Sequence, residues 1–173
     1  MTAIVDSAPS GHITTVEVTV AFTDLEDFTT YTEAEGDDAA SRLLLDHDKV
    51  AGRVVRGRGG RVVKRLGDGF MLTFPSSAAA VLACLQLADA APLPLRAGIH
   101  RGGVRVTQDD IIGHVVNVAA RVTESAGSGE LVVTEPVRTA LGDLRGVAFD
   151  GPYTRSFKGI GEKVPVYLAT HCA

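Results

Sequence analysis

Runs of alternating apolar and polar residues recur along the chain, and each run of this kind predicts a β-strand. The first, VEVTVAF at residues 16–22, alternates and then becomes wholly apolar, which is typical of a strand at the centre of a sheet. Within residues 61–74, two strand-like runs flank Gly67-Asp68-Gly69, and a glycine and aspartate turn between such runs predicts a hairpin. Further strands are expected at residues 95–106, 131–134, 147–157 and 164–169.

Segments with helical spacing lie between these strands. Residues 23–36 offer helix-start residues, and residues 37–56 place apolar side chains at helical intervals before a glycine-rich stretch. Ser76 and Pro92 bracket another helix, because serine is a favoured N-cap and proline cannot continue a helix. Two more helices are expected at residues 115–125 and 136–141.

The order of these elements predicts the fold. They follow one another as β-α-β-β-α-β, with further elements behind them. This is the split βαβ, or ferredoxin-like, order, so we expect an α/β (α+β) fold with additional C-terminal strands. No linker or repeat divides the chain, and residues 15–173 are expected to form one domain after a flexible leader at 1–14. Gly102 and Gly103, inside an expected strand, indicate a bulge or the close approach of another segment.

Composition and charge narrow the classes of function. Of 173 residues, 45% are apolar and 22% charged, which is ordinary for one globular domain. The net charge of −4 gives no general attraction to nucleic acid or anionic lipid, and the basic stretch at 53–65 has no aromatic platform beside it. No apolar run approaches the ~18 residues that span a bilayer, and the first residues lack the features of a secretory signal. We therefore expect a cytoplasmic protein with neither a nucleic-acid nor a membrane partner.

Two aspartates stand where carboxylates can reach out from a rigid scaffold. Asp24 follows the first apolar strand, and Asp68 lies in the turn of the expected hairpin. Hard cations such as Mg²⁺ take oxygen ligands, commonly one or two carboxylates together with substrate phosphates. A structural interpretation is also open for each residue taken alone, with Asp24 as a helix cap and Asp68 as a turn former.

A polar pair on one helix supports the catalytic interpretation. Asn117 and Arg121 are four residues apart and therefore share a helix face. Arginine is suited to clamping a phosphate that gains charge in a transition state. The apolar residues of the same helix are expected to pack on its other side: Val115, Val118, Ala119 and Val122.

Five blocks of the sequence, in order, resemble the class III adenylate cyclases. These are FTDLEDFT at 22–29, KRLGDGFM at 64–71, RAGIHRGGV at 96–104, GHVVNVAARV at 113–122 and FKGI at 157–160. The match covers nearly the whole chain, from about residue 16 to residue 169, and its short form is similar to the cyclase domains of actinobacteria. The resemblance implies a nucleotidyl cyclase fold that acts as a homodimer with ATP as substrate and two divalent metal ions, Mg²⁺ or Mn²⁺, as cofactors.

The resemblance also implies roles for individual residues in metal binding and base selection. Asp24 and Asp68 correspond to the metal-ligating aspartates, with the backbone carbonyl of Leu25 as a further ligand. Lys64 and Asp110 correspond to the pair that selects adenine, because lysine can donate to the ring N1 and aspartate can accept from the N6 amine. Guanine reverses that pattern of donor and acceptor.

Other positions correspond to residues that orient the ribose and hold the phosphates. Asn117 resembles the ribose-orienting residue and Arg121 the residue that stabilises the transition state. Lys158 resembles the lysine that holds the terminal phosphates. Phe28 and Thr29 would lie in the turn whose backbone N–H groups cradle the triphosphate at a helix N-terminus.

The chain departs from the family pattern at two positions. Asp27 stands where many members have glycine, which adds a negative side chain near the expected triphosphate turn. Gly103 stands where some members have an arginine for the β-phosphate, so Arg101 is the expected substitute, with Arg105 as an alternative.

Alternative functions remain open at this point. A guanylate cyclase is disfavoured by the Lys64 and Asp110 pair, and a diguanylate cyclase by the absence of its GG[DE]EF pattern. A catalytically degenerate nucleotide-binding or dimerisation module would be expected to lack a metal aspartate or the transition-state arginine, whereas all are present.

Overall fold

A computed structural model describes residues 14–172 of the chain. The leader expected at 1–14 lies outside the described residues, except for Thr14. The strands are β1 (Thr15–Leu25), β2 (Arg61–Leu66), β3 (Gly69–Phe74), β4 (Leu95–Val106), β5 (Ile111–Ile112), β6 (Leu131–Thr134), β7 (Val147–Arg155) and β8 (Val164–His171). The helices are α1 (Phe28–Glu35), α2 (Asp37–Gly57), α3 (Ser77–Ala90), α4 (His114–Glu124) and α5 (Glu135–Leu141).

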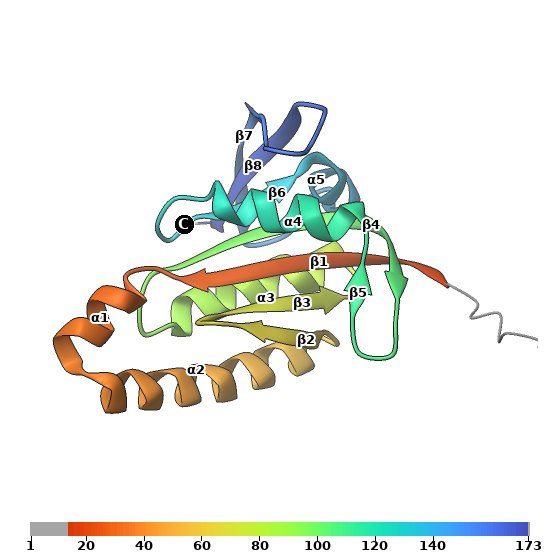
Figure 1. The fold of residues 1–173 in the computed structure, drawn as a ribbon. Helices are drawn as coiled ribbons and strands as arrows, with labels where there is room; N and C mark the ends of the chain where they lie inside the picture. Colours follow the sequence, from red (N-terminus) through yellow and green to blue (C-terminus); the bar gives the residue numbers. More distant parts are fainter. Residues whose placement is uncertain (1–13, 173) are drawn as a thin grey trace, which may run out of the picture.

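The expected ferredoxin-like core is confirmed by the strand order. The sheet runs β2-β3-β1-β4-β6-β8-β7, with β5 paired to β4 as a short arm (Figure 1). Within β2-β3-β1-β4 each strand is antiparallel to its neighbours, and β1 lies between β3 and β4. Strand β6 then pairs parallel to β4, and the additional C-terminal strands β8 and β7 extend that edge.

Helices cover both faces of this sheet, so the central strands bury side chains on both sides. Along β1, Ala21 and Leu25 pack in the core under α2 and α3, whereas Val20 and Phe22 contact residues of α4. Figure 1 shows α2 and α3 on one side of the strands and α4 on the other. We call the second side of the sheet the α4 face.

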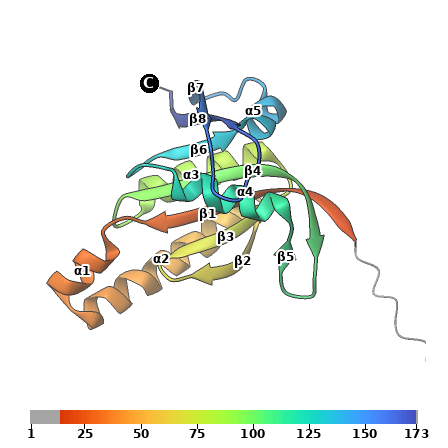
Figure 2. The same ribbon diagram turned by 45° about the horizontal axis from the view of Figure 1, so that its top comes forward.

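Glycines in β4 allow α4 to lie close against the sheet. A Cβ placed on Gly98 would come within 2.3 Å of the backbone nitrogen of Thr123, and one on Gly102 within 2.7 Å of the Val115 side chain. The predicted close approach is thus confirmed at Gly102, and Gly98 is the tighter contact. Figure 2 shows α4 crossing the sheet over β1 and β4.

The expected and observed elements differ mainly at their ends. The strand expected at 147–157 ends at Arg155. In the segment at 23–36, the first three residues complete β1, and Phe28–Glu35 form a separate short helix, α1, before α2 begins at Asp37. The β5 arm was not predicted, because two residues are too few for a periodic signal. Within residues 14–172, no helix combines the length and the apolar character needed to cross a membrane.

Candidate active site

The two aspartates singled out in the sequence lie together at one end of the sheet. Asp24 is the penultimate residue of β1, and Asp68 lies in the two-residue turn between β2 and β3. Both line one cavity of about 460 Å³. The remaining lining residues come from the last position of β1, the loop after it, the start of α1 and one position of β4: Leu25, Glu26, Asp27, Phe28, Thr29, Thr30 and Arg96.

The aspartate pair concentrates negative charge in a partly buried place. Burial raises the pKa of Asp68 above its ordinary value, and the neighbouring carboxylate of Asp24 raises it further. A cation bound between these carboxylates would relieve both effects.

Arg96 balances part of this charge and was missed in the sequence. Its Nη2 and Nε donate to Oδ2 of Asp24 at 2.6 and 3.0 Å, and Nε lies 3.1 Å from Oε1 of Glu26. Arg96 faces Asp24 directly across the β1–β4 ladder. The sequence does mark Arg96 as the first residue of the RAGIHRGGV block, which could have identified it as a site residue. Its pairing with Asp24, however, follows only from the register between β1 and β4.

The turn between β1 and α1 explains the departure at Asp27. Asp27 has φ 59° and is the one non-glycine residue with positive φ in residues 14–172. Glycine adopts this conformation without steric cost, which agrees with the glycine that the family resemblance implies at this position. Helix α1 begins at Phe28 with no side-chain cap, so its first backbone N–H groups are free to meet an anion in the cavity.

Lys64 and Asp110 form an ion pair although 46 residues separate them in the chain. Lys64 Nζ lies 2.5 Å from Oδ2 of Asp110, which lowers the pKa of this carboxyl below its ordinary value. Lys64 pairs with Met71 across the β2–β3 ladder, and Met71 packs in the cluster that contains Val115 of α4. Side chains directly opposite each other share a face, so the ion pair lies on the α4 face.

Asn117 and Arg121 lie on the exposed side of helix α4, whereas Thr123 of the same helix is buried. Asn117 is exposed, and Arg121 contacts Glu124 one turn further on, with 2.5 Å between Nη1 and Oε2. The apolar residues of the helix are buried against the sheet: Val115, Val118, Ala119 and Val122.

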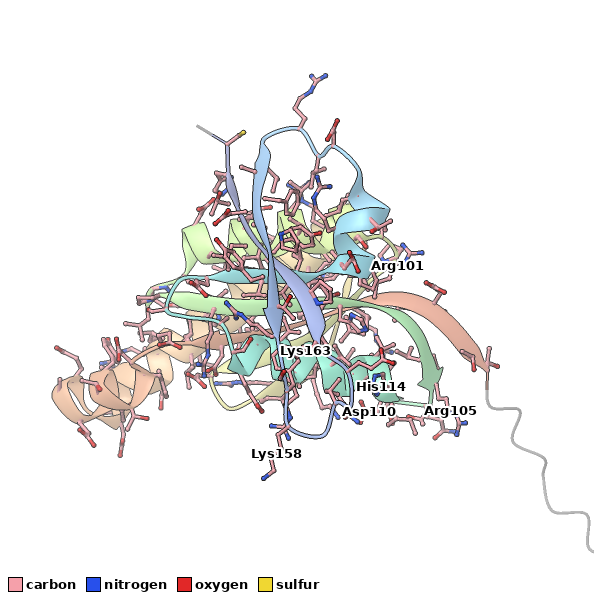
Figure 3. All side chains as sticks on the ribbon, turned by 90° about the horizontal axis from the view of Figure 1, so that it is seen from above. Arg101, Arg105, Asp110, His114, Lys158 and Lys163 are labelled. Carbon is pink, nitrogen blue, oxygen red and sulfur yellow. The ribbon has the colours of Figure 1, made fainter. Side chains whose placement is uncertain are left out.

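Lys158 lies in the loop between β7 and β8 and is exposed. Its neighbours Phe157 and Ile160 pack against Val118 and Val122 of α4, which anchors the loop on this face. Figure 3 shows the Lys158 side chain extending outward from the loop.

Arg101 lies on the opposite face of the sheet. Residues of β4 alternate between the two faces: His100 is opposite Val20 of the α4 face, and Arg101 is opposite Thr19, which contacts Ser77 of α3. Arg101 pairs with Glu17, at 3.2 Å, and lies apart from Asp110 in Figure 3. We therefore do not assign Arg101 to the phosphate site.

Apart from Arg101, the expected site residues thus form two separate groups within one chain. The first group is the cavity with the two aspartates and the start of α1. The second group lies on the α4 face and lines no part of that cavity: Lys64, Asp110, Asn117, Arg121 and Lys158.

The first group fits divalent cations that are shared with a substrate. Among residues 14–172, no three His, Cys, Asp or Glu side chains are arranged to hold a metal ion by themselves. Asp24 and Asp68 supply hard carboxylate oxygens, and this is the number of carboxylates that Mg²⁺ commonly takes from a protein when substrate phosphates complete its shell.

The fold and these groups define a nucleotide cyclase domain. The chain belongs to the adenylate and guanylate cyclase catalytic domain family, whose family model matches residues 12–168. A pH-sensitive adenylate cyclase of Mycobacterium tuberculosis is 34% identical over 166 residues, which cover 87% of this chain and 40% of that protein. An uncharacterized protein of the same organism is 35% identical over 140 residues, covering 78% of this chain and 37% of its own length. The chain therefore spans well under half of these relatives.

Solved structures share the fold at lower identity. The adenylyl cyclase CyaB from P. aeruginosa superposes with a TM-score of 0.81 at 20% identity, covering 94% of this chain and 97% of that one. The guanylyl cyclase Cya2 gives a TM-score of 0.78, also at 20% identity, covering 93% and 95%. Cyclases named for either nucleotide therefore have this architecture, and the fold alone does not select the base.

Proposed function

We propose that this chain is an adenylate cyclase, which converts ATP to 3′,5′-cyclic AMP and pyrophosphate at two equivalent sites between the subunits of a homodimer. The observation that carries the choice of ATP is the ion pair of Lys64 with Asp110 on the α4 face. The 34% identical mycobacterial relative, named an adenylate cyclase, supports the same choice.

Adenine complements the two partners of this ion pair. Lys64 is a donor that can serve the ring N1, and Asp110 is an acceptor that can take the N6 amine. Guanine presents a donor at N1 and an acceptor at O6, so both contacts would be mismatched. Since each side chain is more than a third exposed, a base can enter between them without opening the core.

The aspartate cavity is the proposed place for the triphosphate and its metal ions. Asp24 and Asp68, with the Leu25 carbonyl, would hold two Mg²⁺ or Mn²⁺ ions, and the first N–H groups of α1, at Phe28 and Thr29, would donate to phosphate oxygens. The ions would supply activation of the ribose 3′-hydroxyl and neutralisation of the departing pyrophosphate.

The second group of residues would come from the partner subunit. Asn117 and Arg121 are displayed on an exposed side of α4, as an interface residue pair would be, and neither lines the cavity of its own chain. A two-fold axis repeats every contact, so a cavity facing the partner's α4 generates two equivalent sites. Arg121 would leave Glu124 to meet charge on the phosphoryl oxygens, and Asn117 would orient the ribose.

The proposed reaction balances without a side-chain nucleophile. The 3′-oxygen forms a bond to the α-phosphorus, the bond from that phosphorus to the bridging oxygen breaks, and pyrophosphate leaves with that oxygen. The hydroxyl proton passes to solvent. The chain's own residues contribute position and charge: Lys64 and Asp110 at the base, Arg121 at the phosphoryl group and Lys158 at the terminal phosphates.

A cyclase assay on the purified chain tests this proposal. We expect cyclic AMP from ATP with Mg²⁺ or Mn²⁺, far less cyclic GMP from GTP, and no product after chelation of the metal. Asp24→Asn and Asp68→Asn should each abolish turnover with the fold intact by circular dichroism. Cyclic GMP as the main product would refute the assignment of base, and near-normal activity of either variant at saturating metal would refute the assignment of the metal site.

A further inference from the structure

Near the end of β2, the side chains of Lys64 and Arg65 lie on opposite faces of the sheet. Lys64 lies on the α4 face, whereas Arg65 pairs with Phe70, whose side chain belongs to the core under α2 and α3. Arg65 therefore reaches the α2 side. Its Nη1 donates to Oδ2 of Asp48 on α2 at 3.0 Å, and its Nε donates to the carbonyl oxygen of Gly67 at 2.9 Å.

This contact links a long helix to the turn that carries Asp68. Gly67 and Asp68 form the whole turn between β2 and β3, and Gly67 has φ 63°. Strand β2 is the edge of the sheet, with β3 as its one neighbouring strand in the sheet order, and most of its residues are exposed. The turn therefore has little packing of its own to restrain it.

Arginine suits this link because its planar guanidinium presents several donors in a fixed fork. One side chain holds the turn carbonyl through Nε and the helix carboxylate through Nη1. A lysine could serve one of these acceptors but not both in the same geometry. Metal ligands must be held within about 0.5 Å of their working positions, so the restraint acts on the affinity of the site.

We propose that Arg65 is a positioning residue for Asp68: it ties the β2–β3 turn to Asp48 of α2 and thereby sets the affinity of the aspartate cavity for divalent cations. This inference rests on the proposed function, since it takes Asp68 as a metal ligand. It adds a contact outside the cavity, because neither Arg65 nor Asp48 lines it.

Two variants interrupt the link at its two ends. Arg65→Lys keeps the charge and removes the fork. Asp48→Ala removes the carboxylate, including Oδ1, which is buried and has no hydrogen-bond partner among the described residues. Losing Oδ1 breaks no hydrogen bond, and the pair that Oδ2 makes with Arg65 is partly exposed, so the variant is expected to cost the fold little and a change in metal affinity would not reflect unfolding.

Asp46→Ala is the matched control. It removes another ion pair of the same helix, with Lys49 at 2.9 Å, whose side chains are 76% and 70% exposed and do not touch the turn. All three variants are compared with the unchanged 173-residue chain.

The primary measurement is Mn²⁺ binding, by titration of the free ion with electron paramagnetic resonance. The Mn²⁺ dependence of cyclic AMP formation and hydrogen exchange of the backbone amides at 66–69 are measured in parallel. Loss of a direct outer contact to a metal ligand typically weakens metal binding by about 10–100-fold. Because this link acts on Asp68 through Gly67 and its two side chains are 39% and 32% exposed, we expect the lower end of that range, about 10-fold. Exchange at the turn should become faster in Arg65→Lys and Asp48→Ala, and the maximal rate at saturating Mn²⁺ should change little. Asp46→Ala should match the wild type in every measurement.

Unchanged Mn²⁺ affinity in both Arg65→Lys and Asp48→Ala would overturn the inference, and so would an equal loss in Asp46→Ala. A wild-type chain that binds Mn²⁺ but forms no cyclic nucleotide would refute the proposed function instead, and the binding and exchange data would still decide the role of Arg65.

Discussion

The histidine at position 100 should make the stability of this domain depend on pH. His100 lies on β4 with Nδ1 2.7 Å from Oγ1 of Thr134. Burial lowers its pKa from 6.5 to about 4, with a further contribution from the charge of His114. His100 also lines a cavity. The other titratable residues that line this cavity are His114, Glu135, Glu162 and Lys163.

The direction of this change in stability with pH follows from the number of protons bound in the folded and unfolded states. Because the folded-state pKa lies below the unfolded value, the native protein binds fewer protons across the interval between them. The contribution of His100 to stability is therefore fully present above pH 6.5 and is lost as the pH falls toward 4. With these two values, the loss between pH 7 and pH 5 is about 2 kcal/mol.

Urea denaturation of wild type and His100→Asn at pH 7 and pH 5 measures this loss. Asparagine places an amide near the position of Nδ1, so it can keep a hydrogen bond to Thr134, but it does not titrate. The variant's free energy of unfolding should fall less than that of the wild type between the two pH values, by about 2 kcal/mol.

The control is His171→Asn, because the His171 side chain is 55% exposed. It should follow the wild type at both pH values. If His100→Asn loses as much stability as the wild type between pH 7 and pH 5, the buried neutral state assigned to His100 is wrong.

Three further predictions concern the composite site and the packing of α4. Asp68→Ala and Arg121→Ala should each be nearly inactive, but mixing them should restore roughly a quarter of the wild-type rate if half of the dimers are mixed and the sites act independently; no recovery despite proven subunit exchange would place both residues in one site of one chain. Lys64→Glu with Asp110→Cys should lower kcat/KM for ATP by at least about 100-fold and raise relative use of GTP; an unchanged ratio of ATP to GTP turnover would show that the base is recognised elsewhere. Gly98→Ala should lower the free energy of unfolding by about 3 kcal/mol in urea denaturation, since its Cβ would clash with the α4 backbone; a smaller change than about 0.5 kcal/mol would show that α4 moves aside easily.

Most of the core fold could be predicted from local patterns. The β-α-β-β-α-β order, the hairpin around Asp68 and the buried side of α4 all follow from periodicity and turn residues, which depend on neighbours a few positions away. The placement of Asp24 and Asp68 at element ends could be expected for the same reason. The pairing of Lys64 with Asp110 was expected from the family resemblance, because nothing local relates residues 46 positions apart.

Contacts across the sheet were decided by the tertiary structure. The ion pair of Arg96 with Asp24 depends on the register between β1 and β4, and the link from Asp48 through Arg65 depends on how α2 lies along β2. Neither arrangement leaves a periodic signal in the sequence, since each joins residues from separate elements.

Arg101 shows most directly what the sequence alone could not determine. Strand β4 lies between two other strands with helices on both faces, so its residues show no regular alternation of polar and apolar side chains that would assign Arg101 to one side. The register with β1 assigns it to the face opposite α4. The sequence therefore determined the elements and the ends of elements where charged groups emerge, whereas the pairing of strands and the packing of helices decided which of those groups meet, because a side chain's direction in a two-sided strand is set by its neighbours in space.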